Sequence, residues 1–267
     1  MRGGCALAAT HAQAQGNPLA PIRVRGQSVT PAFEGWYKNP DGTYSLSFGY
    51  FNRNSEEVVD IPIGPENSFT PGPADRGQPT HFHPRRHWGV FTVVVPADTR
   101  EDQKFVWTLI SRSDTTQIPG SLKQGWQIDA LSGEAGSGNT PPQLRFEPSG
   151  ATGAGPGGLM GPPLAAKVGT PLTLDVWATD DGRTPSGHND QPPTLMWFVH
   201  QGPSGATFQP AAPLVDKATG KATTTATFPV AGSYLLRVRV NDASGVVAAG
   251  HAQCCWTNGF VKVTVTP

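Results

Sequence analysis

The sequence predicts an all-β protein, built as two β-sandwich domains joined by a Gly/Pro-rich linker. The 32 glycines and 27 prolines make up about a fifth of the 267 residues, and both residue types disrupt helices but are useful in turns. Short runs in which apolar and polar residues alternate recur along the chain, as expected for strands with one buried face. The chain is also long enough to bury two separate cores.

The first expected domain covers residues 17–131 and contains at least four or five strands. The run "TYSLSFGYF" places Tyr44, Leu46, Phe48 and Tyr50 on one face, which predicts a half-buried strand. The turn sequence "NPDG" precedes it, so residues 33–37 are expected to form its hairpin partner. The runs "GVFTVVVP" and "KFVWTLIS" are apolar on both faces, and this is typical of central strands.

A composition change separates this domain from the second. Residues 132–163 are dominated by Gly, Pro, Ser and Ala, and such a tract is expected to form a linker because it can bury little apolar area. The second domain, residues 164–267, contains regularly spaced strand patterns beginning with "TPLTLDVWATDDG". Turn residues between these strands predict a β-sandwich.

The run "ATFPVAGSYLLRVRVNDASG" and the strands around it resemble a bacterial immunoglobulin-like domain of the polycystic-kidney-disease (PKD) type. The resemblance covers residues 164–267 and implies a buried tryptophan at Trp197 and a corner tyrosine at Tyr234. Leu236 stands where antibody domains carry their second cysteine, so the resemblance implies no disulfide between the sheets. It informs the fold and says little about chemistry.

The N-terminal residues 1–16 have the features of a remnant of a secretory signal peptide. Small residues precede an expected cleavage site near Ala14, which predicts a mature chain that begins at Gln15 or Gly16. Lipidation of Cys5 is an alternative fate for this segment, although Arg2 replaces an apolar residue of that motif. No apolar run is long enough for a membrane-spanning helix. We therefore expect a periplasmic or extracellular location.

The charge balance argues against nucleic acid as a partner. The chain has 20 basic and 20 acidic residues and a formal net charge of zero, so no global field attracts nucleic acid or an anionic membrane.

The segment "HFHPRRH" is the strongest candidate for a metal site. His81 and His83 would share one face of an extended segment, and His87 could fold back toward them to complete a copper, zinc or iron site. The segment also has a faint similarity to the cupin motif, but His87 replaces its glutamate. Arg85 and Arg86 would bring positive charge near a cation. The alternative, which we favour, is a basic loop that binds no metal and leads into a central strand.

Two further groups offer weaker candidates. Cys254 and Cys255 are adjacent, so in an oxidising compartment they are candidates for a vicinal disulfide, with buried or otherwise paired thiols as the alternative. Asp180, Asp181 and Asp242 could bind calcium if they converged, but acidic residues before glycine are also ordinary turn formers.

The sequence contains no catalytic signature, and we expect a non-catalytic binding or scaffold protein, for which an accessory subunit of a cell-envelope complex is one candidate role. Loops and sheet edges are expected to contact a protein partner through Arg85, Arg86, Trp88 and Trp126, because exposed arginines and aromatic residues dominate interface hot spots. Two alternatives remain: a cupin-like metal enzyme that uses the histidine cluster, or a module that binds glycans through exposed aromatic residues.

Overall fold

A computed structural model of the chain describes residues 23–128, 138–184, 187–242 and 255–267. The regular structure of these residues consists of β-strands and one short 3-10 turn, η1 (Gln124–Trp126). The expected all-β class is therefore confirmed. The expected leader, residues 1–16, lies outside the described residues.

The N-terminal half forms two facing three-stranded sheets. One has the order β1-β2-β6, with β1 (Val29–Lys38), β2 (Tyr44–Asn52) and β6 (Arg85–Val95), and the other has the order β4-β7-β8, with β4 (Asn67–Thr70), β7 (Phe105–Ser111) and β8 (Asp114–Gly120). A short ribbon pairs β3 (Val59–Asp60) with β5 (His81–Phe82). Leu46, Phe48 and Tyr50 of β2 are all buried in the core, as predicted. Ser45 and Ser47 on the opposite face are buried as well, so β2 is covered on both faces and the prediction of a half-buried strand is wrong. The strand expected to be central, β6, instead forms one edge of its sheet.

The C-terminal half forms a second sandwich. One sheet joins β10 (Leu159–Met160), β11 (Leu164–Lys167), β15 (Thr194–Gln201), β18 (Gly232–Asn241) and β19 (Trp256–Thr266). The opposite sheet joins β9 (Gln143–Arg145), β12 (Leu172–Thr179), β16 (Thr207–Gln209) and β17 (Lys221–Thr227), and β13 (Arg183–Thr184) pairs with β14 (Gly187–His188) as a separate ribbon. Trp197 is buried in this core, as is Leu236. The Tyr234 hydroxyl donates to the Val230 carbonyl at 2.8 Å, so Tyr234 acts as the expected corner tyrosine.

The segment expected to be a linker differs from that expectation where the structure describes it. Its residues 143–145 form β9, which pairs with β12, and residues 159–160 form β10, which pairs with β19. Leu144 is fully buried in the C-terminal core, which shows how one apolar residue anchors a tract that is otherwise poor in them. The described part of this segment is thus integrated into the C-terminal sandwich, while residues 132–137 lie outside the described residues.

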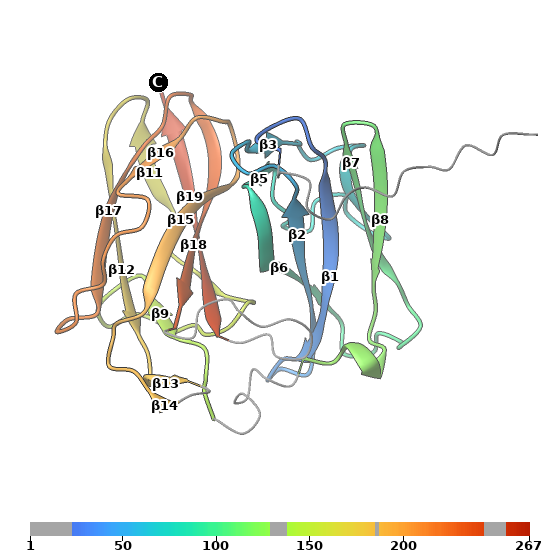
Figure 1. Cartoon of the computed structure of the whole chain (residues 1–267), viewed down its shortest axis with the longest axis horizontal. Coiled ribbons are helices and arrows are strands. Elements are labelled where there is room, and N and C mark those ends of the chain that lie inside the picture. The colour runs from blue at the N-terminus through green and yellow to red at the C-terminus, as the bar shows by residue number, and fades with distance from the viewer. Residues whose placement is uncertain (1–22, 129–137, 185–186, 243–254) are drawn as a thin grey trace, which may run out of the picture.

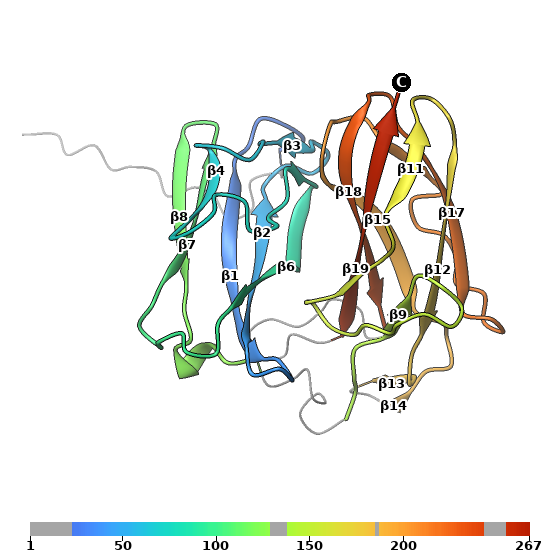
Figure 2. The same ribbon diagram turned by 180° about the vertical axis from the view of Figure 1, so that it is seen from behind.

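The four large sheets are stacked one behind another (Figures 1 and 2). The β1-β2-β6 sheet of the first sandwich lies next to the sheet of the second sandwich that contains β15, β18 and β19. Hydrogen bonds cross between the two: the Thr80 backbone N–H donates to the His200 carbonyl at 2.8 Å, and the Gln201 side chain donates to the Gln78 carbonyl at 2.7 Å. The contact between the sandwiches therefore places residues from the two halves of the chain in one region.

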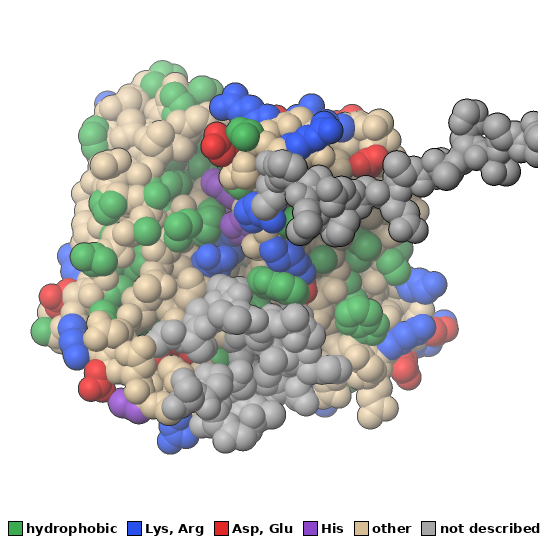
Figure 3. Space-filling view, viewed as in Figure 1, with side chains coloured by type: hydrophobic (Ala, Val, Ile, Leu, Met, Phe, Trp, Pro, Cys, Tyr) green, Lys and Arg blue, Asp and Glu red, His purple; other side chains and the backbone are tan. Residues whose placement is uncertain are grey.

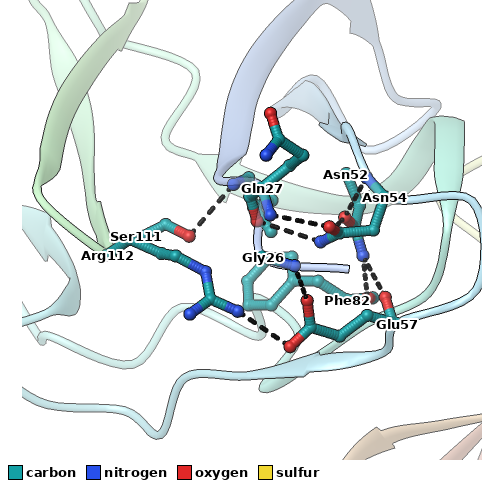
Figure 4. A network of polar contacts seen from close by, with 9 residues as sticks. Gly26, Gln27, Asn52, Asn54, Glu57, Phe82, Ser111 and Arg112 are labelled. Atoms are coloured by element: carbon teal, nitrogen blue, oxygen red, sulfur yellow. Dashed lines mark hydrogen bonds and ion pairs between the residues drawn. The ribbon is translucent and has the colours of Figure 1, made fainter. Parts of the chain in front are cut away.

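Buried asparagines fix the loops at the end of the first sandwich (Figure 4). Asn52 is fully buried, and its amide donates to the carbonyls of Glu57 and Phe82 at 2.7 and 2.8 Å. Its side-chain oxygen accepts from the backbone and side chain of Asn54 at 3.0 and 2.8 Å. Because Phe82 belongs to β5, this network holds in place the strand that carries His81.

Candidate functional site at the contact between the sandwiches

His81 is a hydrogen-bonded link between the two halves of the chain. Its Nδ1 lies 2.6 Å from Asp60 Oδ1 and its Nε2 lies 2.9 Å from the Gly202 carbonyl oxygen. Both neighbours accept hydrogen bonds, so the doubly protonated imidazolium satisfies both. Burial acts to lower the pKa of His81, but the bonds to Asp60 and Gly202 outweigh it and leave the pKa raised. His81 therefore ties β3 and β5 to the second sandwich.

His83 and His87 pack around the ring of Phe198, which comes from β15. Their rings lie 5.0 and 5.6 Å from the Phe198 ring, both close to edge-on, and His87 also stacks on Tyr50 at 4.9 Å. His87 Nε2 lies 3.1 Å from the Pro84 carbonyl oxygen. Burial, reinforced by the charge of Arg237, lowers the pKa of His83 to about 4 and moves that of His87 well below its ordinary value. Both rings are therefore neutral at pH 7.

His200 is a further histidine at this contact, and the sequence analysis did not single it out. Its Nε2 lies 2.7 Å from the Gly77 carbonyl oxygen, and its ring packs on Phe260 at 5.2 Å. Burial lowers the pKa of His200 to about 3. The run "TLMWFVHQ" does contain a pattern that indicates this position. Trp197 faces the C-terminal core, and because side chains alternate along a strand, Phe198 and His200 point to the opposite face.

The segment "HFHPRRH" is not the basic loop leading into a central strand that we favoured, because it forms parts of two strands and the second of them lies at a sheet edge. His81 belongs to β5, and β6 already begins at Arg85, while His81 and His87 are only 6% and 7% exposed. The rings fill the contact with the second sandwich, which the local sequence could not reveal. Within the described residues, no three His, Cys, Asp or Glu side chains form a group that could hold a metal ion.

Arg86, one of the predicted interface residues, forms an ion pair with the buried side chain of Glu34 and so has a structural role. Its Nη2 lies 2.6 Å from Glu34 Oε1, whose side chain is only 4% exposed, and its Nη1 donates to the carbonyls of Tyr50 and His87 at 3.1 and 2.8 Å. Burial raises the pKa of Glu34 to about 7 against the opposing effect of Arg86. The guanidinium also stacks on the Trp88 ring at 3.7 Å.

The other two predicted interface residues have different neighbours. Arg85 has a φ of 72° and its guanidinium lies over the Phe51 ring at 5.2 Å. Trp126 is 49% exposed in η1 and contacts the Phe33 ring at 5.4 Å. The structure thus brings Arg86 and Trp88 together. Trp126 lies against Phe33 instead and remains partly exposed.

Two glycines allow these close contacts, and the sequence analysis missed both. A Cβ atom at Gly49 would lie 2.3 Å from Glu34 Oε1 and from the His87 carbonyl oxygen, so the ion pair of Glu34 can approach β2 only because this position lacks a side chain. Gly89 has a φ of 43°, and a Cβ atom there would lie 2.5 Å from the Trp256 ring. Each glycine therefore marks a place where two segments approach more closely than any side chain permits.

Replacing Arg86 by Met is expected to lower the free energy of unfolding by about 2–4 kcal/mol at pH 7.5, because it leaves the buried Glu34 without its cation. The pKa of Glu34 then rises further. At pH 6 the Glu34 carboxyl of the folded variant is protonated, so the missing cation costs little. At pH 9 this carboxyl must either lose its proton while buried or keep it against the solvent, so the cost of Arg86→Met should be larger at pH 9 than at pH 6.

Urea unfolding of the unmodified chain and of Arg86→Met at pH 6, 7.5 and 9 measures this difference in the free energy of unfolding. Arg100→Met is the matched control, since Arg100 pairs with Asp102 on the surface and such pairs contribute little. The double variant Arg86→Met/Glu34→Gln should recover much of the loss. An equal cost at pH 6 and pH 9 would contradict the assignment of the effect to Glu34.

Asp180, Asp181 and Asp242, the predicted calcium ligands, are described by the structure but do not form a group that could hold a metal ion. Burial, with the nearby charges of Asp242 and Asp181, raises the pKa of Asp180 to about 6. Protein groups already contact each carboxylate: Asn139 donates to Asp242 at 2.7 Å, Thr140 donates to Asp181 at 3.0 Å, and the Gly182 backbone N–H donates to Asp180 at 2.9 Å. Asp180 and Asp181 therefore also act as the turn formers that the alternative interpretation described.

Cys255 is fully buried and disulfide-bonded. Cys254 and Cys5 lie outside the described residues, so the predicted vicinal pairing stays a prediction. Among the described residues, no helix has the length and apolar character to span a membrane.

No protein-family model matches the chain, and no curated protein matches it. Solved structures similar to it include the PKD domain from KIAA 1837 protein, with 20% identity over 40% of this chain and 81% of that one and a TM-score of 0.24. The D00-D0 domain of intimin is 8% identical over 90% of this chain and 100% of that one, with a TM-score of 0.30. The SrpA adhesin from Streptococcus sanguinis is 13% identical over 47% and 58%, with a TM-score of 0.26. The expected resemblance to PKD and immunoglobulin-like sandwiches is thus found, and scores this low carry no argument about function.

Proposed function

We propose that the chain is a non-catalytic binding module of the periplasm or cell surface, whose two sandwiches act as one scaffold. The observation that carries this proposal is the use of the histidines. His81, which motivated an enzymatic interpretation, is bonded to Asp60 and Gly202, and His200 is bonded to Gly77. These rings serve as links between the sandwiches, which is a structural use of residues that otherwise suggest chemistry.

The location rests on two supports. The expected leader at residues 1–16 directs the chain out of the cytoplasm. The disulfide of Cys255 is typical of an oxidising compartment.

The partner is a protein of the cell envelope, and Trp126 is the contact residue with the best support. Its ring is 49% exposed, and a rigid exposed aromatic ring provides a large contact area at small entropic cost. Trp88 stacks on Arg86, so its ring is held in place for a second contact. Replacing Arg85, Arg86 and Trp88 together would not test binding alone, because Arg86 also pairs with the buried carboxylate of Glu34.

Crosslinking of the native chain in its own envelope, followed by purification, tests this function. We expect one protein to be recovered with the unmodified chain and lost with Trp126→Ala. Leu214→Ala is the matched control because Leu214 is an exposed apolar residue, at 93% exposure, away from Trp126. Equal recovery with Trp126→Ala would reject this contact. A glycan array and elemental analysis of the purified protein test the two alternatives, and stoichiometric metal lost with His83→Ala would favour the enzyme.

A further inference from the structure

Two arginines of β18 face the contact between the sandwiches, and neither forms an ion pair with a carboxylate of the described residues. Arg237 is only 2% exposed, and its one hydrogen bond among the described residues runs from Nη1 to Asn258 Oδ1 at 3.1 Å. Arg239 has no hydrogen bond to any described residue. The Nε atoms of both are buried and lack a partner in the part of the chain that the structure describes.

The two guanidinium groups and the histidines converge on one side chain. The central guanidinium carbons of Arg237 and Arg239 lie 4.5 and 5.7 Å from the centre of the Phe198 ring, and the His83 ring lies 5.0 Å from the same ring. The His83 Nε2 atom is also buried and lacks a partner among the described residues. Three side chains from both sandwiches therefore surround Phe198, and each has a buried nitrogen atom without a partner among the described residues.

The charge of this cluster is unusual for a protein interior. A buried charge is normally paired, because its removal from water costs several kcal/mol that only an opposite charge or strong hydrogen bonds offset. Burial lowers the pKa of Arg237 to about 9, although the nearby Tyr50 acts in the other direction, so the guanidinium still carries its charge at pH 7. Of the carboxylates nearest in the fold, Asp60 is bonded to His81 and Ser204, and Glu34 to Arg86.

Two members of the cluster, His83 and Arg239, are partly exposed, whereas Arg237 is buried. Figure 3 shows histidine and Lys or Arg side chains next to one another at the surface where the two halves of the chain meet. The segment that connects β18 to β19, residues 243–254, contains no Asp or Glu, so its sequence offers no counter-charge.

We propose that this cluster is an anion-binding site, in which Arg237, Arg239 and His83 bind a doubly charged oxyanion such as a phosphate or sulfate group between the sandwiches. Two guanidinium groups supply two positive charges and planar pairs of N–H donors that match oxyanion geometry. The same positive charge repels a metal cation, so the cluster selects against the ion that "HFHPRRH" suggested. The inference stands independently of the proposed protein partner.

Thermal unfolding of the full chain with inorganic phosphate or sulfate tests the proposal, with sodium chloride added to hold the ionic strength constant at pH 7.5. We expect a saturable rise in Tm, because a ligand that binds the folded state alone stabilises it. Acetate, with one charge, should require at least a tenfold higher concentration. A phosphate monoester tested beside inorganic phosphate shows whether the site takes the free ion alone or also a phosphate group carried by a larger molecule.

The variants decide which residues bind the anion. Arg239→Gln should weaken the phosphate effect at least tenfold, and His83→Gln should weaken it as well and serves as the second variant if Arg239→Gln unfolds. The matched control is Arg100→Gln, a surface arginine paired with Asp102, which should respond like the unmodified chain. A rise in Tm that merely follows ionic strength, or one that Arg239→Gln and His83→Gln both leave intact, would overturn the proposal.

Discussion

Lowering the pH from 7 to 5 is expected to reduce the free energy of unfolding by about 2 kcal/mol, through the histidines buried between the sandwiches. Burial lowers the pKa of His200 to about 3 and that of His83 to about 4, and it moves the pKa of His87 well below its ordinary value. In the unfolded chain each ring takes up a proton near pH 6.5. Between these limits the unfolded state binds more protons than the folded state, so stability falls as the pH falls.

The size of this loss follows from the number of rings. Each buried histidine contributes at most about 1.4 kcal/mol per pH unit below pH 6.5. His81 acts in the opposite direction, because its raised pKa stabilises the fold at low pH and loses that effect as the pH rises. Two carboxyls also oppose the loss, because burial raises the pKa of Glu34 to about 7 and that of Asp180 to about 6, so both take up protons in the folded state as the pH falls. His81 is protonated in both states below pH 6.5. Three rings therefore act against two carboxyls below about pH 6, and the net slope there is roughly 1.4 kcal/mol per pH unit.

Urea unfolding between pH 8 and pH 5, followed by tryptophan fluorescence, measures the slope. His83→Gln should reduce it by about 1.4 kcal/mol per pH unit. His188→Gln is the control, because His188 lies on the surface with a side chain that is 62% exposed, and it should leave the slope unchanged. A slope that His83→Gln leaves unchanged would show that the buried ring accepts a proton without cost.

Replacing Asn258 by Leu is expected to lower the free energy of unfolding by about 3–5 kcal/mol, because it leaves several buried polar groups without hydrogen bonds at once. Asn258 is fully buried. Its amide donates to the carbonyls of Gly89 and Pro156 at 2.7 and 2.9 Å, and its oxygen accepts from Arg237 at 3.1 Å. Leucine has a similar size but offers none of these bonds, so the loss reports hydrogen bonding and not a cavity.

Urea unfolding at pH 7.5 measures this loss as well. Lys262→Gln is the control, because Lys262 lies on the same strand with its side chain exposed, and surface substitutions away from special features change stability little. A loss below about 1 kcal/mol for Asn258→Leu would mean that water or a rearranged backbone replaces these bonds.

Local patterns in the sequence predict those parts of the fold that local patterns determine. The alternation of Tyr44 to Tyr50 identifies the face of β2 that packs in the core, and that of Leu172 to Ala178 identifies the buried positions of β12. Tyr234 is recognisable because the corner bond to Val230 spans only four residues. In each case the residues that interact are close together along the chain.

The contact between the sandwiches could not be predicted in the same way. His81 meets Gly202 across 121 residues, and Asn258 meets Gly89 across 169, and no periodicity links such pairs. Histidines beside arginines have the composition of a surface loop, so the segment "HFHPRRH" does not by itself indicate contacts with β15 and β18. The composition of residues 138–163 likewise predicts a linker, although a single residue, Leu144, anchors β9 in the core.

The order in which the ribosome makes the chain gives β19 a particular role. The first sandwich has all its strands once residue 120 is made, yet the carbonyl of Gly89 finds its donors only when Trp256 and Asn258 emerge. At roughly 5–20 residues per second, the segment between residue 120 and Trp256 takes roughly 7 to 27 seconds to synthesise. During that interval the first sandwich presents the surface around Gly89 without its partner, so a chaperone that covers this surface would protect the half-made chain until its last strand arrives.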